Sequence, residues 1–298
     1  NYRSTQTILS AANAVIEFNQ GRLGKNLWTS GEEGERISLY AGFNEQDEAR
    51  YIVERVQSWL SQGQNRSSVG ILYRSNAQSR VLEDAFISED IPYRIYGGQR
   101  FYERMEIRNA LAYLRLISSR SDDAAFERIV NMPPRGIGSK TIEILREISR
   151  SNSVSLWQAI ELANENNSLA KRGLTSLLGF KGLIDELEIA VDSLPLEDLV
   201  KQAINTSGLV SYHEKEPGEK GQARIENLEE LISAAREFSP ETDSVPPLQQ
   251  FVDAAALEAG DSQANEYEDS IQLMTLHSAK GLEFPLVILA GMEENLFP

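Results

Sequence analysis

The hydrophobic pattern of this chain changes character twice along its length. In the first hundred residues, short apolar runs rich in β-branched and aromatic residues alternate with helical patterns, and this texture returns in the last thirty residues. Between about residue 97 and residue 269, one helical pattern follows another and strand signals are almost absent. Strands joined by helices favour a mostly parallel α/β sheet. The pattern therefore predicts one α/β sheet, built from both ends of the chain and interrupted by a large all-helical insertion.

Five apolar runs are the expected strands, and two amphipathic stretches between them are the expected helices. The helix predicted over 44–60 begins at Asn44, a residue type that caps helices, and has apolar residues at helical spacing. A second helix is predicted over the run "AQSRVLEDAFISED". The expected strands are 37–40, 69–73, 93–96, 271–276 and 286–290.

Composition excludes several classes of protein and site. The chain has no cysteine and two histidines, which rules out disulfides and thiolate metal sites and leaves little material for a histidine metal centre. The longest apolar runs are too short to span a bilayer, and no charged-then-apolar leader opens the sequence. We therefore expect a cytoplasmic protein with no metal site of its own and no membrane partner.

The net charge is −16, but the charged residues are unevenly distributed along the chain. Residues 66–150 carry 14 basic and 11 acidic groups, whereas residues 211–298 carry 5 basic and 18 acidic groups. Binding to nucleic acid responds to local patches more than to total charge. The arginine-rich middle is compatible with a nucleic-acid surface, although an ordinary solvated surface explains the same numbers.

No complete catalytic site is visible in the sequence. The phosphate-binding pattern Gly-x-x-x-x-Gly-Lys-[Ser/Thr] does not occur, and the run "GIGSKT" at 136–141 has the wrong spacing and follows a helical pattern. The surrounding "PPRGIGSKT" is informative for another reason. Its glycines allow a tight turn with outward amides before a helix that Ser139 or Thr141 could cap, and Arg135 and Lys140 lie beside them. That arrangement suits a DNA phosphate, and a plain helix–turn–helix corner is the competing interpretation.

Two further stretches carry polar groups of interest. In "LMTLHSAKGLEF", His277, Lys280 and Glu283 follow an expected strand, at the edge of a parallel sheet where ligands bind. For His277 taken alone, a structural histidine is the favoured interpretation, and a turn with a surface ion pair explains Lys280 and Glu283 equally well. At the start of the chain, "NYRST" places Tyr2 next to Arg3, a ring that can stack on a base and a cation that can reach a phosphate.

Taken together, these stretches resemble one family, the UvrD/PcrA/Rep group of superfamily 1 DNA helicases, and within it the UvrD branch of gamma-proteobacteria. The resemblance runs from end to end and includes the large helical insertion. It is carried by "NYRST" (motif IV), "ILYRSNAQSR", "GGQRFYERMEIRNALAYLRLI", "DDAAFERIVNMPPRGIGSKT", "GEKGQARIENLEEL" and "LMTLHSAKGLEFP" with "GMEENLFP" (motif V and beyond).

The resemblance implies a division of the chain. Residues 1–96 and 270–298 would form part of a second RecA-like motor domain, and residues 97–269 the helical accessory subdomain inserted in it. The P-loop and the Mg²⁺-binding acidic pair would lie upstream of "NYRST", and the arginine of motif VI downstream of "ENLFP". The chain is then expected to be a piece of an ATP-dependent helicase that is inactive alone and binds no ATP or Mg²⁺ by itself.

The resemblance also implies residue roles. Tyr2 would stack on adenine, and Arg3 would be the catalytic arginine finger on the γ-phosphate. Gly281 and Glu283 would line the same nucleotide cleft. Residues implied to contact DNA are Arg74, Asn76 and His277 on the single strand, and Arg135, Gly136, Ile137, Gly138, Lys140 and Thr141 on the duplex.

The implied activity is a motor that steps 3′ to 5′ along single-stranded DNA in nucleotide excision and mismatch repair, as ATP opens and closes the cleft between two RecA-like domains. Its partners would be single-stranded DNA, a duplex junction, the first RecA-like domain and either repair proteins or a second copy, at the bacterial nucleoid. Two alternatives stay open: a non-catalytic module that binds DNA or protein, and the helicase subunit of a helicase–nuclease complex.

Overall fold

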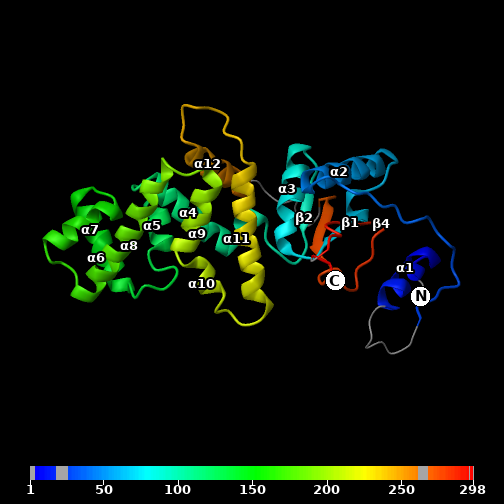
Figure 1. Ribbon diagram of the computed structural model, residues 1–298, viewed down its shortest axis with the longest axis horizontal. Helices are drawn as coiled ribbons and strands as arrows, with labels where there is room; N and C mark the ends of the chain where they lie inside the picture. The colour runs from blue at the N-terminus through cyan, green and yellow to red at the C-terminus, as the bar shows by residue number, and fades with distance from the viewer. Residues whose placement is uncertain (1–3, 18–25, 261–267, 295, 298) are drawn as a thin grey trace.

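A four-stranded parallel sheet lies toward one side of the molecule, and a helical body extends away from it (Figure 1). The computed structural model describes residues 4–17, 26–260, 268–294 and 296–297. The strand order is β2–β3–β1–β4, so strands from both ends of the chain alternate in one sheet, as predicted. The strands are β1 (Val69–Tyr73), β2 (Tyr93–Ile95), β3 (Ile271–Thr275) and β4 (Leu286–Leu289).

Burial follows each strand's place in the sheet. The central strand β1 pairs with β3 on one side and β4 on the other, and all five of its residues are buried. The edge strand β4 alternates, with Val287 and Leu289 about half exposed. A continuous apolar run is what a strand covered on both faces requires.

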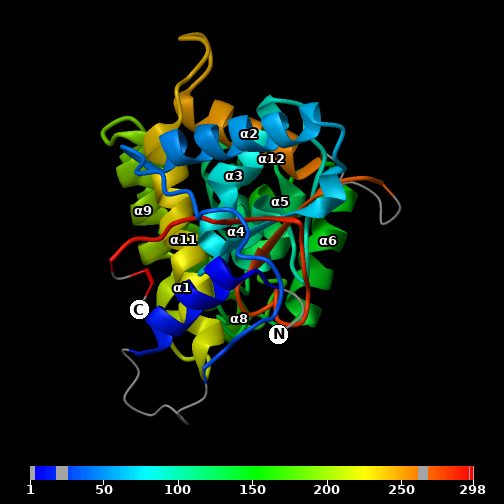
Figure 2. The ribbon, with the colours of Figure 1, turned by 90° about the vertical axis from the view of Figure 1, so that its right-hand side faces the viewer.

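Helices α2 (Glu45–Ser61) and α3 (Ser79–Ser88) cover one face of the sheet, and α1 (Gln6–Glu17) lies apart from both (Figure 2). As predicted, Asn44 caps α2, because its side-chain oxygen accepts the amide hydrogen of Asp47 at 2.8 Å. Both helices pack on the apolar side chains that the strands place on this face of the sheet. The buried core between them contains Ala49, Ile52, Val53, Val56, Val81, Leu82 and Phe86 from the helices and Val69, Ile71, Tyr73, Ile95, Ile271 and Leu273 from the strands.

The strand predicted over 37–40 is wrong. This segment has no regular secondary structure, and the side chain of Leu39 is 91% exposed. Tyr40 explains why: its ring stacks on that of Tyr51 at a centroid distance of 3.8 Å, and its hydroxyl donates to Asp47 at 2.8 Å. The segment is therefore attached to α2 through one aromatic side chain rather than paired with the sheet.

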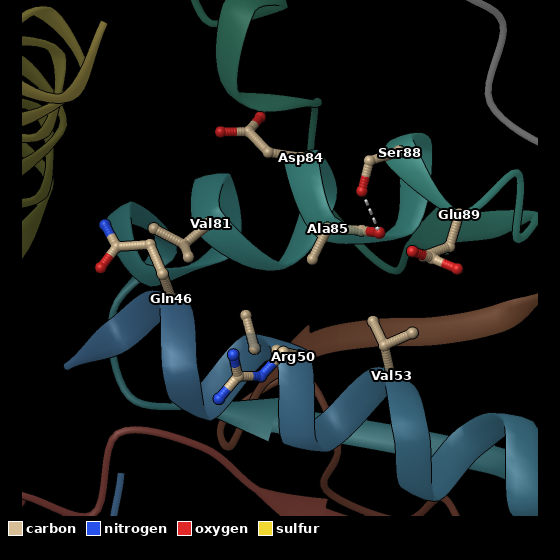
Figure 3. Close-up of a pocket in the computed structure, with 9 residues that line it drawn as sticks. Gln46, Arg50, Val53, Val81, Asp84, Ala85, Ser88 and Glu89 are labelled. Carbon is tan, nitrogen blue, oxygen red and sulfur yellow. Dashed lines mark hydrogen bonds between the residues drawn. The ribbon is translucent and has the colours of Figure 1, made fainter. Parts of the chain in front are cut away.

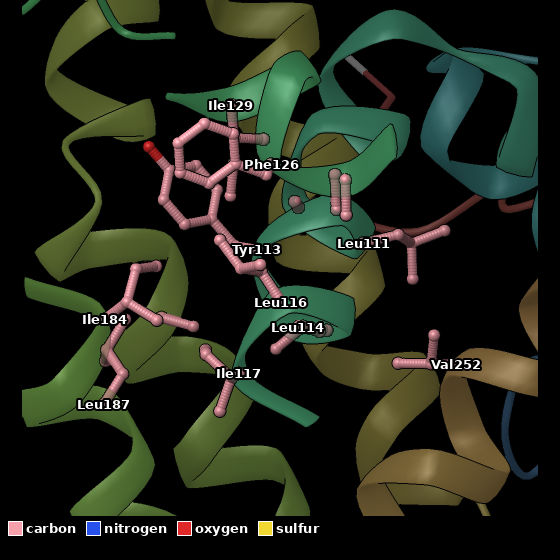
Figure 4. Close-up of a cluster of buried hydrophobic side chains, with 14 of the residues drawn as sticks. Leu111, Tyr113, Leu114, Leu116, Ile117, Phe126, Ile129, Ile184, Leu187 and Val252 are labelled. Carbon is pink, nitrogen blue, oxygen red and sulfur yellow. The ribbon is translucent and has the colours of Figure 1, made fainter. Parts of the chain in front are cut away.

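All regular elements in the described residues between β2 and β3 are helices, which agrees with the absence of strand signals there. Ten of the 14 residues of α4 are buried, which places this helix at the centre of the helical body. Figure 4 shows Tyr113, Leu114 and Leu116 of α4 among side chains of the neighbouring helices. The helices are α4 (Met105–Ser118), α5 (Asp123–Ile129), α6 (Ser139–Asn152), α7 (Leu156–Glu165), α8 (Lys171–Val191), α9 (Leu196–Thr206), α10 (Leu209–His213), α11 (Glu219–Glu237) and α12 (Pro247–Gly260).

A buried ionic cluster joins the sheet side to the helical body. The guanidinium of Arg80, on α3, donates to Glu230 at 2.5 Å and to Glu237 at 2.8 Å, both on α11, and to Asp84 at 2.9 Å. Arg80 itself is 4% exposed. A buried cation held by three carboxylates fixes the helices that carry them, because separating the partners would leave charges without compensation.

The same cluster contains an excess of carboxylates, and this perturbs two of them. Burial, together with the charge of Glu230, raises the pKa of Glu45 to about 7. Burial, together with the charge of Asp84, raises the pKa of Glu258 to about 7. The interface between the two parts of the molecule is therefore a place where protons bind near neutral pH.

No helix in the described part of the chain is long and apolar enough to cross a bilayer.

Candidate nucleic-acid interface

The carboxyl ends of β1 and β3 bring together three residues that the sequence pointed to. The two strands are neighbours, with Tyr73 in register with Thr275, and the amide of Leu276 donates to the carbonyl of Tyr73 at 2.9 Å. Arg74 follows β1 directly and His277 follows β3 by two residues. Both side chains are exposed, as is that of Asn76. The structure thus places Arg74, Asn76 and His277 at one edge of the sheet, facing solvent.

The turn that carries Arg74 and Asn76 is held rigidly by its own side chains. The Oε1 atom of Gln78 accepts the amide hydrogens of Arg74 at 3.0 Å and Ser75 at 2.8 Å. The Ser75 hydroxyl accepts the amide of Ala77 at 3.4 Å and so caps the short 3₁₀ helix Asn76–Gln78. A turn with its backbone groups satisfied presents its exposed side chains from a fixed position.

The turn after β3 is closed in a similar way. The Thr275 hydroxyl accepts the Ser278 amide at 3.2 Å, and the Thr275 carbonyl accepts the Ala279 amide at 3.0 Å. Lys280 is exposed beside His277. Gly281 has φ = +93° and open space around it, so glycine is needed there for its backbone and not for lack of room.

Gly281 and Glu283 lie beyond this turn, on the segment that returns to the start of β4. Both are exposed. The segment crosses the face of the sheet opposite α2 and α3, because the ring of Phe284 packs against Gly70 of β1, where an added Cβ would come within 2.5 Å of it. Tyr2 and Arg3, the expected partners of Gly281 and Glu283 at a nucleotide, lie outside the described residues.

The loop between α5 and α6 is organised by a residue that sequence reasoning missed. The Oδ1 atom of Asn131 accepts the amide hydrogens of Arg135 at 2.7 Å and Ile137 at 3.2 Å. Gly136, between them, has φ = +75°. The Asn131 side chain thus closes the turn from inside, a role that its position just past a helix could have suggested.

Two expectations for this loop are wrong. The guanidinium of Arg135 points inward, where it donates to the Tyr113 hydroxyl at 2.6 Å and to the Ser207 carbonyl at 2.9 Å, and lies 5.4 Å from the ring centroid of Phe180. Ile137 is 3% exposed, and its amide is already used. Carbonyl and hydroxyl oxygens and aromatic faces already satisfy this cation, so Arg135 and Ile137 support the loop from within.

The remaining residues of the loop face outward. Gly136, Gly138 and Lys140 are exposed, and a Cβ at either glycine would meet open space. Gly138 is itself the cap residue of α6 and no side chain caps the helix, so the expected capping by Ser139 or Thr141 is wrong. Thr141 is half-buried against Gly173 of α8. Helix α6 lies at the far end of the helical body from the sheet (Figure 1), so the loop and the sheet edge are separate surfaces.

Sequence reasoning also missed the residues that link the helical body to the sheet edge. Arg104 and Glu226 contact the turn after β1, and Asn227 holds Arg104 in place. Each of the three belongs to a stretch with the pattern of an ordinary amphipathic helix or of its start. Arg104 and Asn227 are less than 10% exposed. The sequence held one signal of this link: Asn227 lies between apolar positions of a helix, and a buried asparagine needs a polar partner.

A groove of about 260 Å³ runs between α2 and α3 (Figure 3). Arg50 and Val53 of α2 face Val81 and Ala85 of α3 across it. None of the predicted site residues lines this groove, so it is distinct from the sheet edge. Within the described residues, no group of three or more histidine, aspartate or glutamate side chains could hold a metal ion.

Comparison with known proteins agrees with the resemblance. The model of the UvrD-like helicase C-terminal domain matches residues 1–298. The chain is 56% identical over 300 residues to DNA helicase II of Escherichia coli (strain K12), covering 100% of the chain and 42% of that protein. It is 51% identical over 300 residues to DNA helicase II of Haemophilus influenzae, covering 100% of the chain and 41% of that protein. It is 38% identical over 303 residues to ATP-dependent DNA helicase PcrA of Staphylococcus aureus, again covering 100% of the chain and 41% of the relative.

The chain therefore spans about two fifths of the length of these relatives. The match extends over every stretch that builds the sheet edge, the loop before α6 and the helical body. The chain belongs to the family of UvrD-like helicase C-terminal domains.

Proposed function

We propose that this chain is the part of an ATP-dependent 3′–5′ DNA helicase that carries a single-strand contact and a duplex contact. The observation that supports it most is the exposed group Arg74, Asn76 and His277, held on rigid turns at the carboxyl edge of the sheet in a member of this family. Ligands of parallel sheets bind at this edge. Residues 1–96 and 270–298 would act as one motor domain and residues 97–269 as its accessory subdomain.

The sheet edge suits single-stranded nucleic acid. Arg74 offers a fork of donors to a phosphate, Asn76 offers an amide to a phosphate or sugar, and His277 offers a ring for stacking. None of these contacts reads the identity of a base edge. Binding at this edge is therefore largely independent of sequence and is weakened by salt.

The loop before α6 is proposed as the duplex contact, on narrower grounds than the sequence indicated. Gly136, Gly138 and Lys140 are its exposed part, and the open space around the glycines lets a phosphate approach the backbone. Thr141, half-buried in the first turn of α6, would contribute its backbone. These contacts would position a duplex without reading its sequence.

The nucleotide chemistry is proposed for the longer protein. Tyr2 and Arg3 would meet Gly281 and Glu283 across an ATP site, with Arg3 on the γ-phosphate. The 298 residues contain no P-loop pattern, and that pattern supplies the amides that hold the β- and γ-phosphates. We expect the purified chain to hydrolyse no ATP, with or without DNA; DNA-stimulated turnover would contradict this.

The biological setting proposed is DNA repair, in nucleotide excision and mismatch repair at the nucleoid of a bacterial cytoplasm. ATP with Mg²⁺ would be the cofactor of the longer protein. Its partners would be single-stranded DNA, a duplex junction, the first RecA-like domain, and repair proteins or a second copy.

Binding of labelled oligonucleotides, followed by fluorescence anisotropy at low salt, tests the proposal. We expect the chain to bind a 20-nucleotide single strand, and Arg74→Ala and His277→Ala to weaken this binding. Arg55→Ala is the matched control, because Arg55 is exposed on α2 away from the sheet edge. Gly136→Asp and Gly138→Asp should weaken binding of a duplex–single-strand junction and leave the single strand unaffected, because each adds a negative charge only at the loop.

Two results would overturn the proposal. One is single-strand binding that Arg74→Ala and Arg55→Ala weaken equally. The other is an absence of single-strand binding even at low salt, which would mean that the net negative charge of the chain dominates. Junction binding without single-strand binding would favour the non-catalytic DNA-binding module instead.

A further inference from the structure

The turn that carries Arg74 and Asn76 is held by the helical body as well as by its own side chains. The hydroxyl of Ser75 donates to Oε2 of Glu226, on α11, at 2.5 Å. These residues are 151 positions apart in the sequence, and both are partly buried. A hydrogen bond to a carboxylate is among the stronger ones a hydroxyl makes, and partial burial shields it from competing water.

A second link reaches the same turn from the start of α4. The guanidinium of Arg104 donates to the Asn76 carbonyl at 2.9 Å and to the Ser79 hydroxyl at 2.7 Å. It also donates to Oδ1 of Asn227, on α11, at 2.9 Å. Because Arg104 is only 7% exposed, its donors are satisfied almost entirely by the protein. One buried cation thus connects α4, α11 and the turn.

Both links hold the turn that carries the proposed single-strand contact. Glu226 holds the residue between Arg74 and Asn76, and Arg104 holds the carbonyl of Asn76 itself. Neither Glu226 nor Arg104 is placed to touch DNA, since Glu226 faces the turn from α11 and Arg104 is buried. A change in the position of α11 relative to the sheet would move the acceptor of Ser75 and therefore the turn.

We propose that Glu226 and Arg104 are positioning residues through which the helical body sets the geometry of the single-strand contact. The inference rests on the proposed function for its DNA readout, because it assumes that Arg74 and Asn76 bind the strand. The link itself is a property of the fold and has its own readout. In this arrangement, docking of α11 against the sheet side and single-strand affinity are coupled equilibria.

Glu226 offers the cleaner test, because its carboxylate has one hydrogen-bond partner among the described residues, Ser75. Glu226→Ala removes the acceptor, whereas Glu226→Gln keeps an acceptor oxygen at the same position. Both substitutions remove one negative charge near the bound single-stranded DNA, so any electrostatic gain in DNA affinity is common to the two variants. Glu229→Ala, on the exposed face of α11, controls for loss of charge from the same helix.

Single-strand affinity and its dependence on salt provide the functional readout. We expect Glu226→Ala to bind about threefold to tenfold more weakly than Glu226→Gln, because the turn loses its fixed position. The slope of log affinity against log salt should be the same in both variants, since the phosphate contacts themselves remain. Equal affinities in the two variants would overturn the proposal. A slope that differs between the two variants would also overturn it, because it would mean that the substitution changes the number of phosphate contacts and not only the position of the turn.

Amide hydrogen exchange of a peptide covering residues 74–78 provides the second readout and needs no DNA. Exchange should be faster in Glu226→Ala than in Glu226→Gln and Glu229→Ala, because the turn opens more often without its acceptor. If the chain binds no single strand but the exchange differs as expected, the proposed function fails and the positioning link stands. If single-strand binding is normal and neither readout separates the two variants, the positioning link fails alone.

Discussion

Replacing Arg104 by methionine should strongly destabilise the protein, because its buried guanidinium joins α4, α11 and the turn after β1. Methionine keeps the length and apolar volume of the stem, so the change removes the guanidinium and little packing. The lost donors leave the Asn76 carbonyl and Oδ1 of Asn227 without their 2.9 Å partners. They also leave Glu83, whose carboxylate lies 3.9 Å from the guanidinium, with a weaker cationic environment.

The expected loss in the free energy of unfolding is about 3–5 kcal/mol, the range for removing one partner of a buried ion pair. Each orphaned acceptor alone would cost about 1–3 kcal/mol, and the terms overlap because they share one network. Burial raises the pKa of Glu83, and Arg104 opposes that shift. Without Arg104 the carboxyl takes up a proton more readily, so the loss should be smaller at pH 5 than at pH 8.

Urea unfolding, followed by circular dichroism and tryptophan fluorescence, measures this loss. Arg108→Met is the matched control, because Arg108 lies one turn further along α4, is exposed, and its guanidinium has no hydrogen-bond or ion-pair partner among the described residues. It should change the free energy of unfolding by less than about 0.5 kcal/mol. A loss below about 1 kcal/mol for Arg104→Met, or equal losses at the two positions, would refute the reasoning that a buried guanidinium joins α4, α11 and the turn.

Three further results are expected. The pKa values of Glu45 and Glu258 are raised to about 7 in the folded state, so their contribution to stability is present at low pH and is lost as the pH rises through 7. Urea unfolding should therefore show a lower free energy of unfolding at pH 8 than at pH 5, and Glu258→Gln should make this difference smaller. Asn131→Ala removes the acceptor of two loop amides and should lower the free energy of unfolding by about 1–3 kcal/mol, measured by thermal unfolding. Gly136→Ala should cost about 1 kcal/mol by the same assay, because its φ is +75° while its surroundings are open, and a neutral result would contradict the need for a left-handed residue.

Much of the architecture could be predicted from the hydrophobic pattern alone. The uninterrupted apolar run of β1 and the cap residue Asn44 are local signals, and both elements form where these signals predict them. The run 37–40 has the same β-branched and aromatic character as β1, yet it forms no strand. Strand formation needs a partner as well as propensity, and propensity is the only part that the sequence displays.

The candidate site was predictable only in part, for a related reason. Arg74, Asn76 and His277 were found because the carboxyl ends of neighbouring parallel strands must meet. Arg135 was misjudged, because a charged residue beside glycines reads as exposed until the aromatic rings of Tyr113 and Phe180 are placed around it.

One partner of Arg104, Asn227, and the partner of Glu226, Ser75, each lie more than 100 residues away in the sequence. Helical periodicity places a side chain on a face of its own helix but does not show which other segment that face meets. Long-range polar contacts of this kind therefore stayed outside the reach of pattern reasoning.

The salt dependence of single-strand binding tests the central claim most directly, namely that the sheet edge is an electrostatic single-strand contact. Log affinity should fall linearly with log salt, and Arg74→Ala should reduce the magnitude of that slope by about 0.7, the value for one phosphate contact on a single strand. Arg55→Ala should leave the slope unchanged. An unchanged slope in Arg74→Ala, or the same reduction in Arg55→Ala, would contradict the assignment of this edge to the DNA strand.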